Sequence, residues 1–199
     1  MRLDLTHIKE WIPRNSKVLD LGCGDGEFLR LLRDERGVSA TGIEIDIVQL
    51  SAAVGRGLNV LQQDLDTGLP NFPDKSFDVV VMAHALQALH HPHRALENVV
   101  RIGSEAIVTF PNFGHWRCRL HLVLFGQMPV SRVLPYSWYD TPNIHFCTVK
   151  DFEALCHQLD IEILAQDVVG VDARDTWLAR LWPNLFAVTA IFRIRRRQC

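Results

Sequence analysis

Short apolar runs alternate with longer helical segments along the first 110 residues. Runs rich in Val, Ile and Leu that are bounded by Gly, Asp or Pro are typical of strands. Strands are predicted at residues 17–21, 40–44, 58–63, 77–82 and 105–109. Helices are predicted at residues 5–12, 27–36 and 93–102, and another begins at residue 46.

This alternation predicts an α/β fold. Strands joined by helices form a parallel sheet with helices on both faces, and right-handed crossovers leave that sheet open. The run Val79-Val80-Val81 suits a strand buried on both faces. A capping-box-like sequence starts a helix at Thr148, and two last strands are predicted at residues 161–166 and 185–194. We therefore expect an open, doubly wound, mostly parallel seven-stranded sheet with helices on both faces.

The length of the chain is compatible with one domain. A chain of 199 residues can bury a sizeable core, and no repeat or linker divides the sequence. The alternation breaks after the fifth strand, where residues 111–147 precede the next clear helix. We expect a single domain over residues 1–199, with residues 111–147 as an insertion between the fifth and sixth strands.

Composition and charge narrow the class of protein. The chain is 48% apolar with a net charge of −2, unlike a general nucleic-acid binder, which carries a basic excess. The N-terminus holds Asp4, Lys9 and Glu10, so it lacks the apolar core of a signal peptide. The longest apolar stretch, residues 79–89, is too short to cross a bilayer. We expect a cytoplasmic protein without nucleic-acid or membrane partners, and a solvated, partly frayed end at the arginines of residues 193–197.

Cysteine and histidine spacing gives little support for a metal site. The five cysteines form no Cys-x-x-Cys pair and are expected to be free thiols. His115, Cys118 and His121 could share one helix face, but no fourth ligand is marked nearby, and a zinc site needs one. An amphipathic helix with scattered polar residues accounts for this spacing, and an exposed turn around Pro92 accounts for the neighbouring histidines. No metal is expected.

A glycine-rich loop, Asp-Leu-Gly-Cys-Gly-Asp-Gly at residues 20–26, joins the first strand to a helix. Glycine at alternate positions lets the backbone turn sharply and approach a ligand closely. Ligands of open α/β sheets bind at the carboxyl ends of the strands, so a cofactor is expected here. Dinucleotide loops read GxGxxG and phosphate loops end in Gly-Lys-Ser/Thr, whereas this loop reads GxGxG without a lysine. The loop therefore suits a cofactor with adenosine and no pyrophosphate.

Two acidic residues end the next two predicted strands. Glu44 follows the loop by about 20 residues, where a carboxylate can accept hydrogen bonds from both hydroxyls of a ribose. Asp64 could accept a hydrogen bond from an adenine amino group. Either acid alone could instead cap the following segment or be exposed. Together with the loop, at three strand ends, they indicate a nucleoside-cofactor site.

These segments resemble the class I S-adenosylmethionine-dependent methyltransferases. The resemblance covers residues 18–26, 42–46, 63–65 and 72–80. It implies S-adenosylmethionine as the cofactor, with the glycine loop beside its methionine part, Glu44 on the ribose and Asp64 on the adenine. His84 should lie near the sulfonium. The cofactor-binding residues that the resemblance implies are Asp20, Gly22, Cys23, Gly24, Glu44, Ile45, Asp64, Leu65 and Ala83.

Later segments are similar to the MetW family of methionine biosynthesis proteins. They include residues 109–119, 128–131, 134–139, 141–147 and 181–185. This similarity runs over nearly the whole chain. It implies a bacterial protein needed for methionine synthesis that works with homoserine O-acyltransferase as its protein partner.

Three functions are compatible with these residues. We favour an accessory or regulatory partner of homoserine O-acyltransferase that binds S-adenosylmethionine. The alternative is an S-adenosylmethionine-dependent methyltransferase acting on a small molecule, in which proximity carries much of the catalysis and His84 or His115 could act as a base. A nucleic-acid methyltransferase is disfavoured by the acidic balance. Residues 81–85 also lack the Asn/Asp-Pro-Pro-aromatic signature of many amino-group methyltransferases.

The insertion at residues 111–147 has the composition of a protein interface. Aromatic residues, Met and Arg are enriched in interface cores and hot spots. We expect this segment to begin at the cofactor edge of the sheet and to meet a protein partner; the alternative is a lid or satellite core of the same domain. The residues concerned are Trp116, Arg117, Arg119, Phe125, Met128, Arg132, Tyr136, Trp138 and Tyr139.

Overall fold

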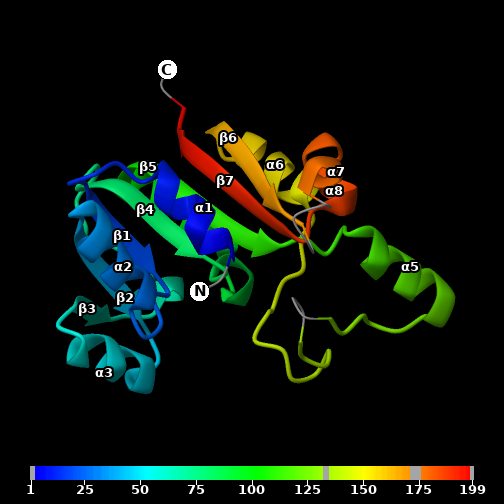
Figure 1. Cartoon of the computed structure of the whole chain (residues 1–199), viewed down its shortest axis with the longest axis horizontal. Helices are drawn as coiled ribbons and strands as arrows, with labels where there is room; N and C mark the ends of the chain where they lie inside the picture. The colour runs from blue at the N-terminus through cyan, green and yellow to red at the C-terminus, as the bar shows by residue number, and fades with distance from the viewer. Residues whose placement is uncertain (1–2, 132–134, 171–175, 198–199) are drawn as a thin grey trace.

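The computed structural model describes residues 3–131, 135–170 and 176–197 (Figure 1). The strands are β1 (Lys17–Leu21), β2 (Ser39–Glu44), β3 (Asn59–Gln62), β4 (Phe77–Ala83), β5 (Gly103–Pro111), β6 (Ile161–Val169) and β7 (Thr189–Arg196). The α-helices are α1 (Leu3–Trp11), α2 (Glu27–Arg36), α3 (Ile47–Gly55), α4 (Pro92–Ile102), α5 (Trp116–Phe125), α6 (Val149–Gln158), α7 (Thr176–Leu181) and α8 (Pro183–Phe186). Two 3-10 turns are η1 (Leu65–Thr67) and η2 (Leu86–Ala88).

The seven strands form one sheet in the order β3-β2-β1-β4-β5-β7-β6. Strands β1 to β5 pair in parallel, and β7 runs antiparallel to both β5 and β6. The strand order reverses between β1 and β4, and the carboxyl edge of an open sheet binds ligands at such a switch point. The predicted mostly parallel, seven-stranded sheet is confirmed.

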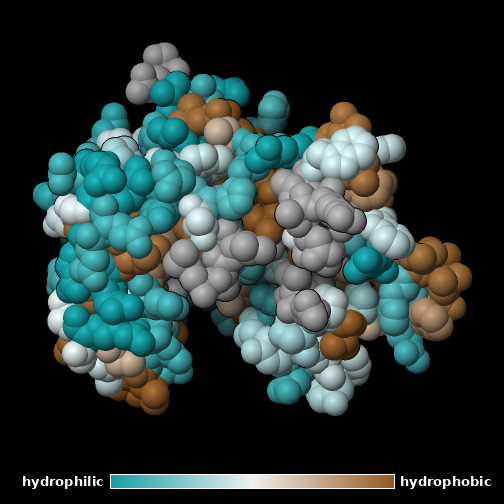
Figure 2. Space-filling model, in the orientation of Figure 1, coloured by the Kyte–Doolittle hydropathy of each residue, from teal (hydrophilic) through white to brown (hydrophobic). Residues whose placement is uncertain are grey.

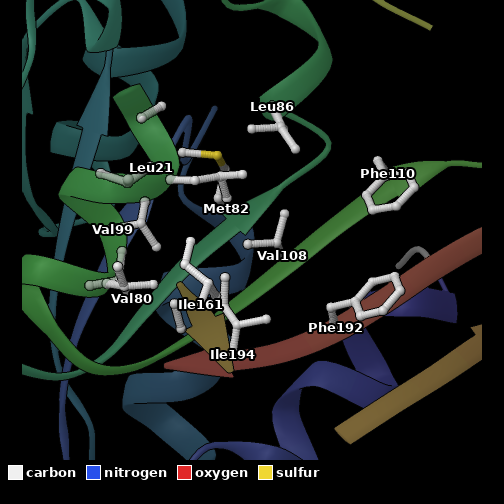
Figure 3. Close-up of a cluster of buried hydrophobic side chains, with 14 of the residues drawn as sticks. Leu21, Val80, Met82, Leu86, Val99, Val108, Phe110, Ile161, Phe192 and Ile194 are labelled. Atoms are coloured by element: carbon white, nitrogen blue, oxygen red, sulfur yellow. The ribbon is translucent and has the colours of Figure 1, made fainter. Parts of the chain in front are cut away.

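Helices cover both faces of this sheet and create two cores. The larger core lies under α4 and α6, where Phe110, Phe152 and Phe192 pack with ring centroids 4.6–5.9 Å apart. Figure 3 shows part of this core, with side chains of β4, β5 and β7 pointing into one cluster. The second core lies under α1 and α2 on the opposite face, and it includes Ile8 and Ile12. Figure 1 shows α1 lying across that face.

Local sequence signals explain several boundaries. Gly37 adopts a left-handed conformation (φ 66°) and its N–H bonds back to the last turn of α2, as a helix C-cap requires. The capping box predicted at Thr148 is present, because Thr148 and Asp151 each accept the other's backbone N–H. The segment with the His115, Cys118 and His121 spacing does form a helix, α5, which contains Cys118 and His121 and has His115 as its N-cap.

Two predictions near the C-terminus are wrong. The strand expected at residues 185–194 begins only at Thr189, because Pro183 starts the short helix α8, and proline is favoured in the first helical turn. The arginines expected in a frayed end lie largely within β7. Arg193 binds Glu105 of β5 at 2.6 Å and Arg195 binds Glu162 of β6 at 2.8 Å, so opposite charges on neighbouring strands order this segment.

The structure also bears on cysteine state and membrane insertion. Cys23, Cys118, Cys147 and Cys156 are free, as predicted, whereas Cys199 lies outside the described residues. Within the described ranges, every helix is too short or too polar to cross a bilayer.

Candidate cofactor site

The glycine loop turns between β1 and α2 at the switch point. Gly22, Gly24 and Gly26 all have positive φ (75°, 57° and 75°), a conformation that side chains disfavour. The N–H groups of Gly22 and Cys23 both bond to the Ile43 carbonyl of β2, at 2.8 and 3.1 Å. This explains why the sequence needs glycine at alternate positions: the loop bends back onto the neighbouring strand.

Glu44 links the end of β2 to this loop by a hydrogen bond. Its Oε2 accepts the Gly24 N–H at 2.8 Å, and its Oε1 accepts the N–H groups of Ile45 and Asp46 at 2.8 and 2.9 Å. Ile45 itself is 60% exposed beside this carboxylate. The structure therefore joins three of the predicted cofactor residues, Gly24, Glu44 and Ile45, by hydrogen bonds.

Cys23 occupies a space that Gly42 leaves open. A Cβ at Gly42 would lie 2.5 Å from the Cys23 sulfur, so only glycine fits at that position of β2. Burial, together with the carboxylates of Asp20 and Glu44, raises the pKa of the Cys23 thiol to about 12. The thiol is therefore neutral at physiological pH, which suits a packing residue rather than a nucleophile.

Asp64 and Leu65 lie at the neighbouring strand end. Asp64 accepts the Asp66 N–H at 2.9 Å and so caps η1. Capping of the following segment was the alternative to adenine binding for this residue. Leu65 packs against the larger core. Asp66 in turn accepts the N–H groups of His90 and His91, and these bonds outweigh burial and hold the Asp66 pKa below its ordinary value. Hydrogen bonds thus link the acidic turn that follows β3 to the segment that follows β4.

Asp20 and His84 complete the edge at the switch point. Asp20 is 3% exposed and lies opposite Gly42 of β2 and Val81 of β4. His84 follows Ala83 directly, with an unusual positive φ of 61°, and its N–H bonds to the Thr109 carbonyl at 3.0 Å. Strained residues of this kind concentrate at functional sites.

A residue of the N-terminal helix reaches this edge as well. Asp4 of α1 is 5% exposed and its Oδ2 lies 3.0 Å from Nε2 of His84. No site role was expected for Asp4, although the sequence holds a signal: Asp4 precedes Ile8 and Ile12 at intervals of four residues, and these two isoleucines are buried in the second core. A buried acidic side chain is normally paired, and Asp4 is paired with His84.

His115 is placed differently from His84. It is buried at the N-cap of α5, where its Nδ1 accepts the Arg117 N–H at 3.2 Å. This capping bond occupies one ring nitrogen and gives His115 a structural role. In the described part of the chain, no group of three or more His, Cys, Asp or Glu side chains is arranged to hold a metal ion.

The insertion returns to this same edge through Gln87 of η2. The Gln87 side-chain amide donates to the Pro111 carbonyl and the Cys147 sulfur, both at 3.2 Å. Its backbone carbonyl accepts the N–H groups of Ile144 and His145 at 2.8 and 3.0 Å. Both ends of residues 111–147 are therefore held at the segment that follows β4.

An acidic side chain takes the place at the N-terminus of α2 where a pyrophosphate would bind in a dinucleotide site. Asp25 accepts the Glu27 N–H there. A hydrogen bond from Arg56 holds the Asp25 pKa below its ordinary value, so the carboxylate is ionised and paired with a guanidinium. Thr109 Oγ1, on the residue of β5 that pairs with Ala83, is fully buried and has no hydrogen-bond partner within the described residues. The carboxylates of Asp20, Glu44 and Asp64 make this edge of the sheet acidic, which suits a cationic ligand better than an anionic one.

Comparison with known proteins decides the family. The family model described as methionine biosynthesis protein MetW matches residues 2–194. The chain belongs to the MetW family. The bifunctional methionine biosynthesis protein MetXA/MetW of Rhodopirellula baltica is 36% identical over 205 residues, which cover 98% of this chain and 33% of that relative. This MetW-family chain therefore spans about a third of the relative's length.

Solved structures support the same fold. An S-adenosylmethionine-dependent methyltransferase of Mesorhizobium loti has a TM-score of 0.69 and 21% identity, covering 96% of both chains. A Haloferax volcanii methyltransferase, solved in complex with the Trm112 methyltransferase activator, has a TM-score of 0.70 and 18% identity, covering 97% of this chain and 88% of that one. The fold is that of the class I methyltransferases.

Proposed function

We propose that this MetW-family protein binds S-adenosylmethionine at the carboxyl edge of the sheet. The observation that carries the proposal is the hydrogen-bonded pair of the glycine loop and Glu44 at the switch point. The protein's own groups would divide the work along the cofactor. The loop with Asp20 would lie along the methionine part, Glu44 and Ile45 would hold the ribose, and Asp64 with Leu65 would bind the adenine. Ala83 would flank the sulfonium.

The same protein acts, in our proposal, as an accessory or regulatory partner of homoserine O-acyltransferase. The support is the R. baltica relative, whose name joins MetXA and MetW activities in one chain. This MetW-family chain covers only a third of that relative, which leaves room for the acyltransferase part. Two domains in one chain are held at a high effective concentration of each other. Two separate chains need a binding interface to stay together in this way.

The test measures both binding of the cofactor and association with the acyltransferase. Calorimetry with S-adenosylmethionine should show saturable binding to the purified protein. Homoserine O-acyltransferase from the same organism should co-purify with it, and the acyl-transfer rate should change when the protein is added. Absence of heat with the cofactor removes the first part of the proposal, and an unchanged acyl-transfer rate without co-purification removes the second.

One observation favours methyl transfer to a small molecule as the second candidate. The buried Asp4 carboxylate and the partly exposed His84 imidazole form a pair, which would lie beside the expected methyl group. In such a pair the carboxylate orients the imidazole so that its other nitrogen can accept a proton. Transfer of a radiolabelled methyl group to metabolites, abolished by His84→Ala, would establish this activity.

A further inference from the structure

The helix α5 exposes more apolar side chains than a helix that packs only within its own chain. Trp116, Leu120, Val123 and Leu124 recur at i, i+4, i+7 and i+8, the spacing by which a helix normally meets a core. These four side chains are instead 38%, 45%, 80% and 63% exposed. The inward face holds Cys118, the one buried residue of α5.

The position of α5 agrees with this exposure. Figure 1 shows α5 extending away from the sheet. Arg119 donates to the carbonyls of Gly114 and Asn184, which fixes the base of the helix. Figure 2 shows apolar atoms gathered over α5 at the right of the molecule. A closed lid would bury these four side chains against the sheet, whereas all four are exposed.

Charge identifies the kind of partner that fits. Arg117 and Arg119 lie on the two sides of the apolar stripe, and α5 contains no acidic residue. A second copy of this chain, packed stripe to stripe about a two-fold axis, would bring these arginines near their own equivalents without a carboxylate on either helix. An apolar groove rimmed by carboxylates complements the stripe, and helices of this pattern dock in such grooves.

We infer that α5 is the docking helix of this protein, and that it binds in an apolar groove on homoserine O-acyltransferase whose rim carries carboxylates. This inference rests on the proposed function, which supplies the partner. Trp116, Leu120, Val123 and Leu124 enter the groove, and Arg117 pairs with its rim. Because Gln87 holds both ends of the insertion beside Ala83 and His84, the docked helix is attached to the segment that flanks the cofactor.

The experiment compares two exposed valines. Val123→Glu places a charge in the middle of the stripe, whereas Val54→Glu makes the same change on α3, where Val54 is 52% exposed. Neither change should unfold the chain, since both sites are exposed; melting curves check this. Affinity for purified homoserine O-acyltransferase is measured by calorimetry, with vesicles of phosphatidylcholine and phosphatidylglycerol as a second titrant and light scattering for the oligomeric state.

The expected result is specific to α5. Wild type and Val54→Glu should bind the acyltransferase equally, and Val123→Glu should bind at least about 30-fold more weakly, as for a central hot-spot residue. If wild type and Val123→Glu bind equally well, α5 is not the docking helix, although the proposed partnership stands. If wild type binds no acyltransferase, the proposed partnership itself is wrong. Vesicle binding or dimerisation that Val123→Glu abolishes would assign the stripe to lipid or to a second copy and overturn the inference.

Discussion

Glu44 offers the sharpest test of the cofactor site. A carboxylate has about four acceptor positions, and the N–H groups of Gly24, Ile45 and Asp46 take three of them. Oε2 receives only one of these bonds, so a ribose hydroxyl can bind there without displacing the loop. A hydrogen bond to a charged group contributes about 1.5–3 kcal/mol. Glu44→Ala should therefore weaken S-adenosylmethionine binding by about 10- to 150-fold.

Two further variants test the acceptor atoms of Glu44 and the effect of net charge. Glu44→Gln keeps one carbonyl acceptor but turns an NH₂ group toward backbone donors, so its affinity should lie between those of wild type and Glu44→Ala. Asp46→Ala removes an equal charge nearby, where Asp46 caps α3 through the N–H groups of Val48 and Gln49. It should lower the free energy of unfolding by about 0.5–2 kcal/mol. Cofactor affinity should stay within about threefold, because an exposed charge is screened.

Calorimetry at constant pH and salt gives the dissociation constants, and thermal melts show whether each variant is folded. The reasoning about Glu44 is refuted if Glu44→Ala remains folded and binds S-adenosylmethionine as tightly as wild type. It is also refuted if Asp46→Ala loses as much affinity as Glu44→Ala, because the effect would then come from net charge.

Three other predictions concern stability and reactivity. Phe152→Ala removes a ring that packs on both Phe110 and Phe192, so denaturant unfolding should show a loss of about 3–5 kcal/mol. Burial raises the Asp167 pKa, but hydrogen bonds from the Val168 N–H and His7 outweigh it and hold that pKa below its ordinary value. A carboxylate with a depressed folded-state pKa contributes stability above its unfolded pKa, and this contribution is lost as the pH falls through the folded pKa. Asp167→Asn should therefore destabilise the protein at pH 7, and the difference in the free energy of unfolding should shrink as the pH falls below the ordinary Asp value of about 3.9; a difference that does not shrink in acid would contradict this. Burial raises the pKa of Cys23 and Cys156 to about 12 and that of Cys147 to about 11, so in a Cys199→Ser variant these thiols should react with a disulfide reagent at pH 8 only after unfolding, and rapid labelling of the native protein would show the burial to be wrong.

The sequence was sufficient for the parallel half of the sheet because its signals are local. Apolar runs such as Val79-Val80-Val81 mark buried strands, and Gly37 marks the end of α2. The glycine loop and the acids at two strand ends identify a ligand edge, since parallel strands bring their carboxyl ends together. These features follow from neighbouring residues and a topological rule.

The sequence was insufficient where distant residues decide the structure. Asp4 meets His84 across 80 positions, and Arg193 meets Glu105 across 88. A run of arginines looks like a solvated tail until β5 and β6 supply carboxylates on either side of β7. The exposed stripe of α5 could not be foreseen, because its spacing is that of a buried helix face.

The place of β7 in the sheet has a consequence for how the protein is made. β7 follows β6 along the chain yet lies between β5 and β6, so during synthesis β6 emerges from the ribosome before the strand that joins it to the sheet. Until Thr189–Arg196 is available, β5 presents an unpaired edge with Phe110 and Val108 facing an incomplete core. Unpaired edges of this kind recruit other chains. A pause or truncation before β7 should therefore expose the nascent protein to aggregation and to chaperones, whereas β1 to β4 have all their strand partners by residue 111.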